Sequence, residues 1–178
     1  MSYGYGSYQG PEIGCVWGWD NVSGFGRLEG GSTSASLWPT ANKAFYYPIN
    51  FKTPVAVNRL NVFIGTTASA HIDAGLYDFN GNKLVTAGST NIAGSSTVQT
   101  FTLTTTLIPR GMNYFAIAVD TTATFRLNGF TSLTGTQLVT QGIREQASAF
   151  PLPASITLTT QTSFNFIPQF SVLAASLP

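Results

Sequence analysis

The sequence predicts an all-β fold: a two-sheet antiparallel jelly-roll sandwich preceded by an extended N-terminal arm. Three observations predict it. Short segments rich in Thr, Val, Phe and Tyr recur along most of the 178 residues, which suffice for one domain with a real core. Gly, Asn and Pro, which form turns, separate these segments. No segment of about 11 residues carries the apolar stripe of a helix.

Residues 1–43 are the predicted arm, and residues 44–178 are the predicted sandwich domain. The arm opens with "MSYGYGSYQG" and shows neither a period of 2 nor one of 3.6. Glycine weakens regular structure, so a flexible tail is one interpretation. Aromatic anchors dominate protein interfaces, which favours an arm docked on a partner or a neighbouring subunit. The residues that would carry the docking are Tyr3, Tyr5, Tyr8, Trp17 and Trp19.

The first two strands of the predicted domain have irregular features. "AFYYPINF" (44–51) contains Pro48, which cannot donate to a sheet ladder and so favours an edge position. In "PVAVNRLNVFI" (54–64), the apolar residues change from odd to even positions at Asn58-Arg59. This switch predicts a β-bulge or a bend between sheets at that point.

Strand signals continue to the C-terminus. In "HIDAGLY" (71–77), polar His71 and Asp73 alternate with apolar residues. The other predicted strands are residues 83–87, 97–103, 113–119, 124–127, 136–140, 155–160 and 164–172. Residues 141–150 could hold one short helical turn. This spacing allows about eight to ten strands, which suits a jelly roll.

Composition narrows the function. Charged residues make up 8% of the chain, against roughly 25% in typical domains, and the net charge is +1. We therefore expect no nucleic-acid partner, because binding requires a basic patch. We also expect no membrane partner, since no apolar run approaches the ~20 residues of a span, and no secretory signal is visible. A charge-poor surface repels its neighbours weakly, which fits either an extracellular domain or a protein packed in a large assembly. Cys15 stands alone and can form no intrachain disulfide.

The stretch "YDFNGNKL" (77–84) allows two interpretations. Asp78, Asn80 and Asn82 have the spacing of the first calcium ligands of an EF-hand loop. However, that loop has glycine at its sixth position and glutamate at its twelfth, where this chain has Lys83 and Ser89. Asn80-Gly81 instead favours a hairpin with a type I′ turn. We therefore expect no metal and no cofactor, although a calcium site completed by other loops stays open.

Catalysis is not expected either. The only histidine is His71, and Asp73 lies on the same strand face, but no "GxSxG" marks a nucleophile. A glycosidase needs two carboxyl groups facing one cleft; Asp73 and Asp120 could meet across neighbouring strands, but no sequence pattern indicates that they do. Binding is more plausible, because flat aromatic surfaces suit sugars. The candidate glycan-binding residues are Trp38, Tyr46, Tyr47 and Tyr77, with burial in the strands as the alternative.

The segments "FYYPINFKTPVAVNRLNVFIG", "HIDAGLYDFNGNKLVTAGST", "TVQTFTL" and "LIPRGMNYFAIAVD" carry a family resemblance. Together with the final "PQFSV", they resemble the jelly-roll domains of bacteriophage virion proteins, such as fibres, spikes and capsid decoration proteins. The resemblance covers about residues 44–172 and leaves the arm uncovered. It is more specific for the architecture than for a position in the virion, because such folds host many roles.

The resemblance implies a non-enzymatic virion protein, most simply a capsid decoration (cement) or fibre component. Its expected partners are other virion proteins, reached through the arm, and further copies of itself, with a trimer favoured. The alternative is a receptor- or carbohydrate-binding module of a tail fibre, with a host-surface glycan as its ligand.

Overall fold

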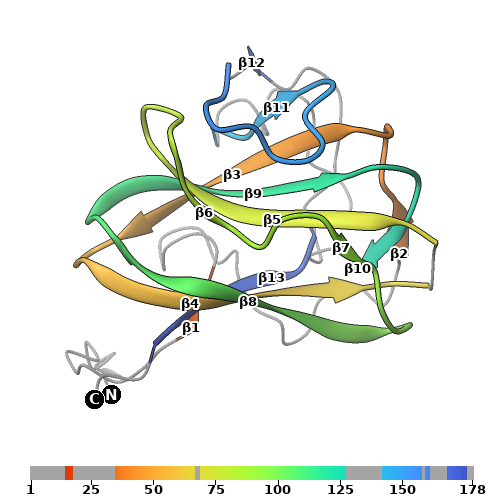
Figure 1. The fold of residues 1–178 in the computed structure, drawn as a ribbon, viewed down its shortest axis with the longest axis horizontal. Helices are drawn as coiled ribbons and strands as arrows, with labels where there is room; N and C mark the ends of the chain where they lie inside the picture. The colour runs from red at the N-terminus through yellow and green to blue at the C-terminus, as the bar shows by residue number, and fades with distance from the viewer. Residues whose placement is uncertain are drawn as a thin grey trace, which may run out of the picture.

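The computed structural model describes residues 15–17, 35–66, 69–126, 142–157, 159–160 and 168–175. In this part of the chain every regular element is a strand, and the strands form two antiparallel sheets packed together (Figure 1). The predicted all-β sandwich is therefore confirmed at this level. No helix long and apolar enough to cross a membrane occurs among the described residues.

Sheet A forms one layer. Its strands are β1 (Cys15–Trp17), β2 (Ala35–Leu37), β4 (Val55–Ile64), β8 (Thr97–Ile108), β10 (Thr124–Arg126) and β13 (Phe170–Ala174). Their order is β1-β13-β4-β10-β2, and β8 also pairs with β4. Strand β4 is thus the centre of the layer.

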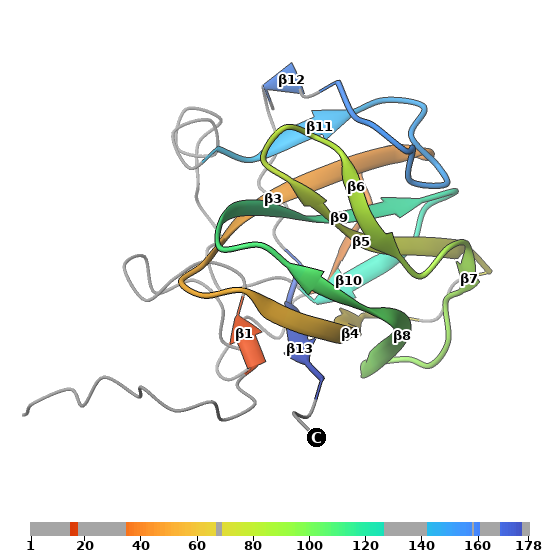
Figure 2. The ribbon, with the colours of Figure 1, turned by 60° about the vertical axis from the view of Figure 1, so that its left-hand side comes forward.

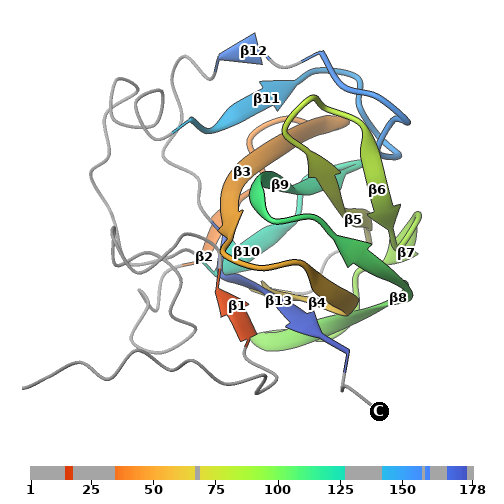
Figure 3. The ribbon, with the colours of Figure 1, turned by 90° about the vertical axis from the view of Figure 1, so that its left-hand side faces the viewer.

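Sheet B forms the other layer. Its strands are β3 (Lys43–Phe51), β5 (His71–Asp78), β6 (Lys83–Thr86), β7 (Thr90–Asn91), β9 (Gly111–Val119), β11 (Arg144–Gln146) and β12 (Thr159–Thr160). Their order is β12-β11-β3-β9-β5-β6, and β7 also pairs with β5. Figure 3, which looks along the sandwich, shows the two layers facing each other across the core.

The main core lies between the layers and follows from the alternation of side chains along the strands. In β5, Ile72, Ala74 and Leu76 point into it. The core also holds the aromatic residues Trp38, Phe45, Tyr47, Phe51, Phe101, Phe115, Phe125 and Phe170. Trp38 packs edge-on against Phe45 and Phe125, with ring centroids 5.1 and 5.4 Å apart.

The predicted irregularity in 54–64 is a β-bulge. The register between β4 and β8 shifts between Val57 and Arg59, because Val57 pairs with Thr106 and Arg59 with Thr102. The apolar positions before and after the shift can therefore both face the core. Pro48 pairs with Tyr114 of β9 and lies beyond the residues of β3 that pair with β11. Its missing N–H thus interrupts no ladder with β11.

Residues 141–150 differ from the sequence interpretation. The part of this segment that is described contains strand β11 rather than a helical turn. Arg144, Glu145 and Gln146 pair with Tyr46, Phe45 and Ala44 of β3. The edge of sheet B offers these residues backbone partners that a single helical turn would lack.

A segment that we call the strap (residues 147–157) covers the outer face of sheet B. Figure 2 shows the chain after β11 lying over β3 and β9. The strap contributes Ala149 and Leu152 to a second buried cluster, whose members on the sheet include Ala44, Ala116 and Ala118. These small residues let the strap approach the sheet closely. The central strands of sheet B are therefore buried on both faces.

We predict that Gly75→Ala destabilises the fold. A Cβ atom at Gly75 would lie 2.6 Å from the carbonyl oxygen of Val85 and 3.0 Å from the Cβ atom of Thr86. The first neighbour is backbone and cannot turn away, so β6 must move from β5. We expect the free energy of unfolding to fall by about 1–3 kcal/mol, as for other overpacked sites, measured by urea denaturation. An unchanged midpoint would contradict the tight packing between these strands.

Candidate functional site

The strap is held by hydrogen bonds from β5, β6 and the hairpin between them. The Tyr77 hydroxyl donates to the Pro153 carbonyl at 2.6 Å. Lys83 donates twice, from Nζ to the Leu152 carbonyl at 3.0 Å and from its backbone N–H to the Ala154 carbonyl at 2.9 Å. These bonds fix the strap over the sheet and satisfy carbonyl groups that the packing would otherwise bury unpaired.

Asp73 is a buried acid beneath the strap, with 1% of its surface exposed. The Thr86 hydroxyl donates to its Oδ1, and the backbone N–H of Leu152 donates to its Oδ2 at 3.0 Å. Thr86 Oγ1 in turn accepts a hydrogen bond from the Gly88 N–H at 2.9 Å. One carboxyl group therefore ties the strap, β5 and β6 together.

Burial raises the pKa of the Asp73 carboxyl above its ordinary value, because desolvation disfavours the charged form. The hydrogen bonds from Thr86 and Leu152, and the charge of Lys83, oppose this shift but do not cancel it. A carboxyl group with a raised pKa is a feature of many active sites, although structural networks produce it as well. Here one donor to Asp73, the Leu152 N–H, belongs to the strap and the other, the Thr86 hydroxyl, belongs to β6, so the geometry is that of a structural tie.

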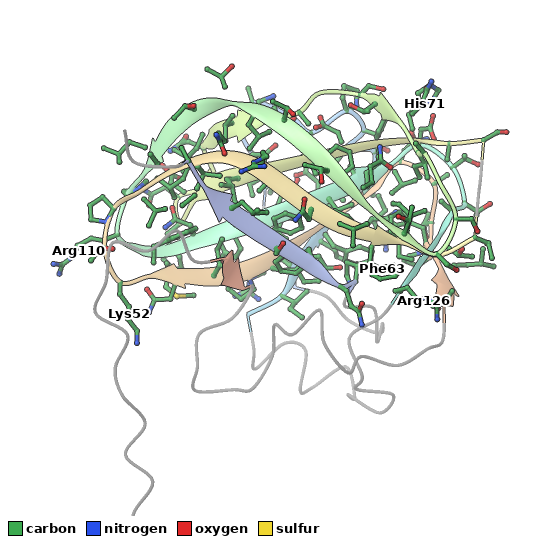
Figure 4. The ribbon with its side chains drawn as sticks, turned by 90° about the horizontal axis from the view of Figure 1, so that it is seen from below. Lys52, Phe63, His71, Arg110 and Arg126 are labelled. Carbon is green, nitrogen blue, oxygen red and sulfur yellow. The ribbon has the colours of Figure 1, made fainter. Side chains whose placement is uncertain are left out.

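His71 pairs with Asp120 rather than with Asp73. Its Nδ1 lies 2.6 Å from Asp120 Oδ2, and its backbone N–H donates to Asp120 Oδ1 at 2.8 Å. Burial alone would raise the pKa of Asp120, but the hydrogen bonds and the charge of His71 lower it. The His71 side chain is half exposed, and Figure 4 shows it at the opposite end of the sandwich from Lys52 and Arg110.

This pair supplies two members of a Ser-His-Asp arrangement and no more. Among the described residues, no hydroxyl group forms a hydrogen bond with the His71 ring. Asp73 pairs in register with Ala118, while Asp120 binds His71 beyond the end of β9. The register thus places the two carboxyl groups on the same face of neighbouring strands, offset by two residues, but they bind different partners: Asp73 accepts from Thr86 and Leu152, and Asp120 binds His71.

The "YDFNGNKL" stretch forms the predicted hairpin between β5 and β6, but with another turn. Within this turn only Gly81 has a positive φ, of 87°, whereas a type I′ turn would require a positive φ at Asn80 too. The Gly81 N–H donates to the Asp78 carbonyl at 3.0 Å, which closes a tight turn ending in a left-handed glycine. This is the pattern of the longer hairpin loop with a glycine bulge.

The Asp78 carboxylate is used within this turn. Its Oδ1 accepts from the Asn82 N–H at 2.8 Å, and its Oδ2 accepts from Asn82 Nδ2 at 2.9 Å. Partial burial would raise its pKa, but these hydrogen bonds lower it. Nowhere in the described residues do three or more His, Cys, Asp or Glu residues gather as metal ligands would.

The four aromatic residues considered for glycan binding are all buried. Trp38, Tyr46, Tyr47 and Tyr77 have exposed fractions of 0–1%. Trp38 and Tyr47 belong to the main core, while Tyr46 and Tyr77 lie under the strap with their rings edge to face at 5.5 Å. None of these rings can stack on a sugar unless the strap or the sandwich opens.

Most of the predicted docking residues cannot be placed. Tyr3, Tyr5, Tyr8 and Trp19 lie outside the described residues. Trp17 is the last residue of β1 and pairs in register with Ser171 of β13. Part of the predicted arm therefore joins an edge of sheet A.

Sequence reasoning missed one exposed aromatic residue. Phe79, at the tip of the β5–β6 hairpin, is 60% exposed and stacks on Tyr114 with ring centroids 6.1 Å apart. Its position in a turn, where polar residues are usual, was the available signal.

Comparisons of the chain with models of known protein families, with curated proteins and with solved structures gave no match.

We predict that Asp73→Asn changes how stability depends on pH. Because the folded pKa of Asp73 is raised, its contribution is fully present below the ordinary value of about 3.9 and is lost as the pH rises through the folded pKa. The stability of Asp73→Asn relative to the natural protein should therefore increase as the pH rises from about 4. Urea unfolding at a series of pH values measures this difference.

Asp78→Asn is the matched control, because the pKa of Asp78 is lowered. Its contribution is lost as the pH falls, so the relative stability of Asp78→Asn should change with pH in the opposite direction. Asp73→Ala should be less stable than Asp73→Asn by about 1–3 kcal/mol, because it leaves the Leu152 N–H without an acceptor. Parallel pH profiles for the two Asn variants would contradict this account.

Proposed function

We propose that this protein is a non-enzymatic structural component of a bacteriophage virion: a capsid decoration (cement) or fibre protein of the jelly-roll type. The observation that carries the proposal is the pairing of β1 with β13. Residues 15–17, which belong to the predicted arm, pair with an edge strand of the sandwich. Such an arm can dock on a neighbouring virion protein while the sandwich stays folded.

The scarcity of charge supports the proposal. The whole chain has 8 Lys and Arg and 7 Asp and Glu residues. Lys43 and Glu145 pair at 3.3 Å, His71 pairs with Asp120, and the Asp73 and Asp78 carboxylates are engaged within the fold. A surface with so few charges can pack closely against neighbouring subunits.

The resemblance to virion jelly rolls adds a second, weaker support. Its most specific stretches, "GLYDFNGNKLV" and "NYFAIAVD", form the β5–β6 hairpin and most of β9, which lie side by side in sheet B. They thus belong to one region of the fold.

We predict that the aromatic rings of the arm are required for incorporation into particles. Tyr3→Ser, Tyr5→Ser and Tyr8→Ser combined should reduce incorporation at least tenfold, because interface aromatics contribute most of the binding energy. The matched Tyr→Phe triple variant keeps the rings and should be incorporated. Mass spectrometry of purified particles assembled with each variant measures the amount. Normal incorporation of the serine variant would sink the proposal.

The alternative, a receptor- or glycan-binding module, is favoured by one observation. Phe79 presents an exposed ring on a hairpin that the hydrogen bonds of Asp78 hold rigid. If this function is correct, Phe79→Ala should lose binding on a glycan array or to host cell envelopes, because stacking needs the ring. Phe79→Tyr should retain it. Equal binding of the Phe79→Ala variant and the natural protein would exclude this site.

A further inference from the structure

Strand β8 is a long free edge of sheet A. Among the described residues it pairs only with β4, over Thr97–Thr102 and again over Thr106–Ile108. Figure 4 views sheet A from its outer side, where β8 runs along the margin beyond β4. In antiparallel pairing, alternate residues of an edge strand direct their N–H and C=O groups away from the sheet. No second strand pairs with those of β8 in the described part of the chain.

The edge lacks most of the features that protect natural edge strands. Its sequence, "TVQTFTLTTTLI", contains no charged residue and no proline in 12 residues. Lysines, prolines, shortness and bulges are the usual defences. The one defence present is the bulge, which lies between Thr102 and Thr106. Residues 97–102 therefore form a regular ladder edge without charge or proline. Beside it, the Gln99 side chain donates to the Asn91 carbonyl at 2.8 Å and accepts from the Ala93 N–H at 3.0 Å.

The outer face of this ladder suits another β-strand. Phe101 and Leu103 point into the core, so the alternate residues at positions 98, 100 and 102 face outwards. Val98, Thr100 and Thr102 are exposed, and the exposed fraction of Val98 is 38%. All three are β-branched, and such residues pack well as cross-strand pairs.

We propose that residues 97–102 of β8 pair antiparallel with the same residues of a second copy of this chain. The twofold axis stands perpendicular to sheet A, so two copies of that sheet join into one continuous sheet. A second copy is favoured because the strand is neutral: pairing with itself brings no like charges together, and it offers no charge by which an acidic or basic strand could select it.

This pairing goes beyond docking through the arm and has a different symmetry. Contact of one surface with itself is isologous and closes with two copies, whereas the trimer expected from the sequence would need two different surfaces. Because no charged residue of β8 takes part, the pair should also be insensitive to salt.

The first test measures mass in solution on the full chain. Light scattering after size exclusion should give twice the 18.9 kDa of one chain as the concentration rises, in low salt and in about 1 M salt alike. Thr100→Lys should shift the dimer dissociation constant at least tenfold, because two cations then meet near the axis. Thr100→Val keeps the β-branched shape and should dimerise. Thr122→Lys, an exposed substitution in the connection between β9 and β10, should also dimerise.

The second test locates the contact by disulfide cross-linking in a Cys15→Ser background. Val98, Thr100 and Thr102 are replaced by cysteine one at a time and then mixed in pairs. If a twofold axis relates the two strands, at least one single variant or pairwise mixture places two cysteines opposite each other and should cross-link efficiently. Asn80→Cys, at the exposed tip of the β5–β6 hairpin, should not. Circular dichroism of each variant confirms that it folds.

Three results would overturn the pairing. They are a single-chain mass at every concentration, a mass of three chains, and a dimer that neither responds to Thr100→Lys nor cross-links through β8. These results are separate from the fate of the proposed function, because the tests use no virion. The arm variant Tyr3→Ser, Tyr5→Ser, Tyr8→Ser should still dimerise.

Discussion

The packing of the strap on sheet B is the constraint on which the rest of the structure depends. It turns the outer face of β3, β9 and β5 into a second core, so that residues 44–49 and 113–119 are buried without interruption. A sheet that is buried on both faces must satisfy its polar groups internally. Asp73 does this at the crossing of the strap, β5 and β6, where it accepts hydrogen bonds from Leu152 and Thr86. Burial disfavours the charged form of this carboxyl group, and the same hydrogen bonds that hold the strap offset part of that cost.

The two sheets therefore present different surfaces. The chain covers the outer face of sheet B with its own strap, whereas much of the outer face of sheet A carries exposed threonines and Val98. A threonine face needs no cover, because its hydroxyl groups can bond to water or to neighbours, as Thr100 does to Asn61 at 2.8 Å. The outer surface of β8 is thus uncharged and β-branched, with the exposed Arg59 of β4 beside Thr102.

The sequence predicted those features of the fold that are determined within a single strand or turn. The parity change at Asn58-Arg59 identified the bulge, because alternation is set along one strand. The strap was missed because contacts between distant segments leave no period in the sequence. For the same reason Tyr46 and Tyr77 were considered as surface platforms: alternation shows that they face away from the main core, but not that residues 149–156 cover them. The turn at Asn80-Gly81 was assigned the wrong type, since its geometry depends on the Asp78 carboxylate and on the contact of Gly81 with Ile156.

The position of β8 within sheet A connects the two proposed contacts. Strand β1 lies at one margin of the sheet, next to β13, while β8 lies beyond β4 on the other side. A second copy that adds at β8 therefore need not displace residues 15–17 from β13. Each contact also uses a different kind of interaction: aromatic rings in the arm, and backbone hydrogen bonds with β-branched pairs at β8. One neutral sandwich could thus hold a partner at one margin and its own copy at the other.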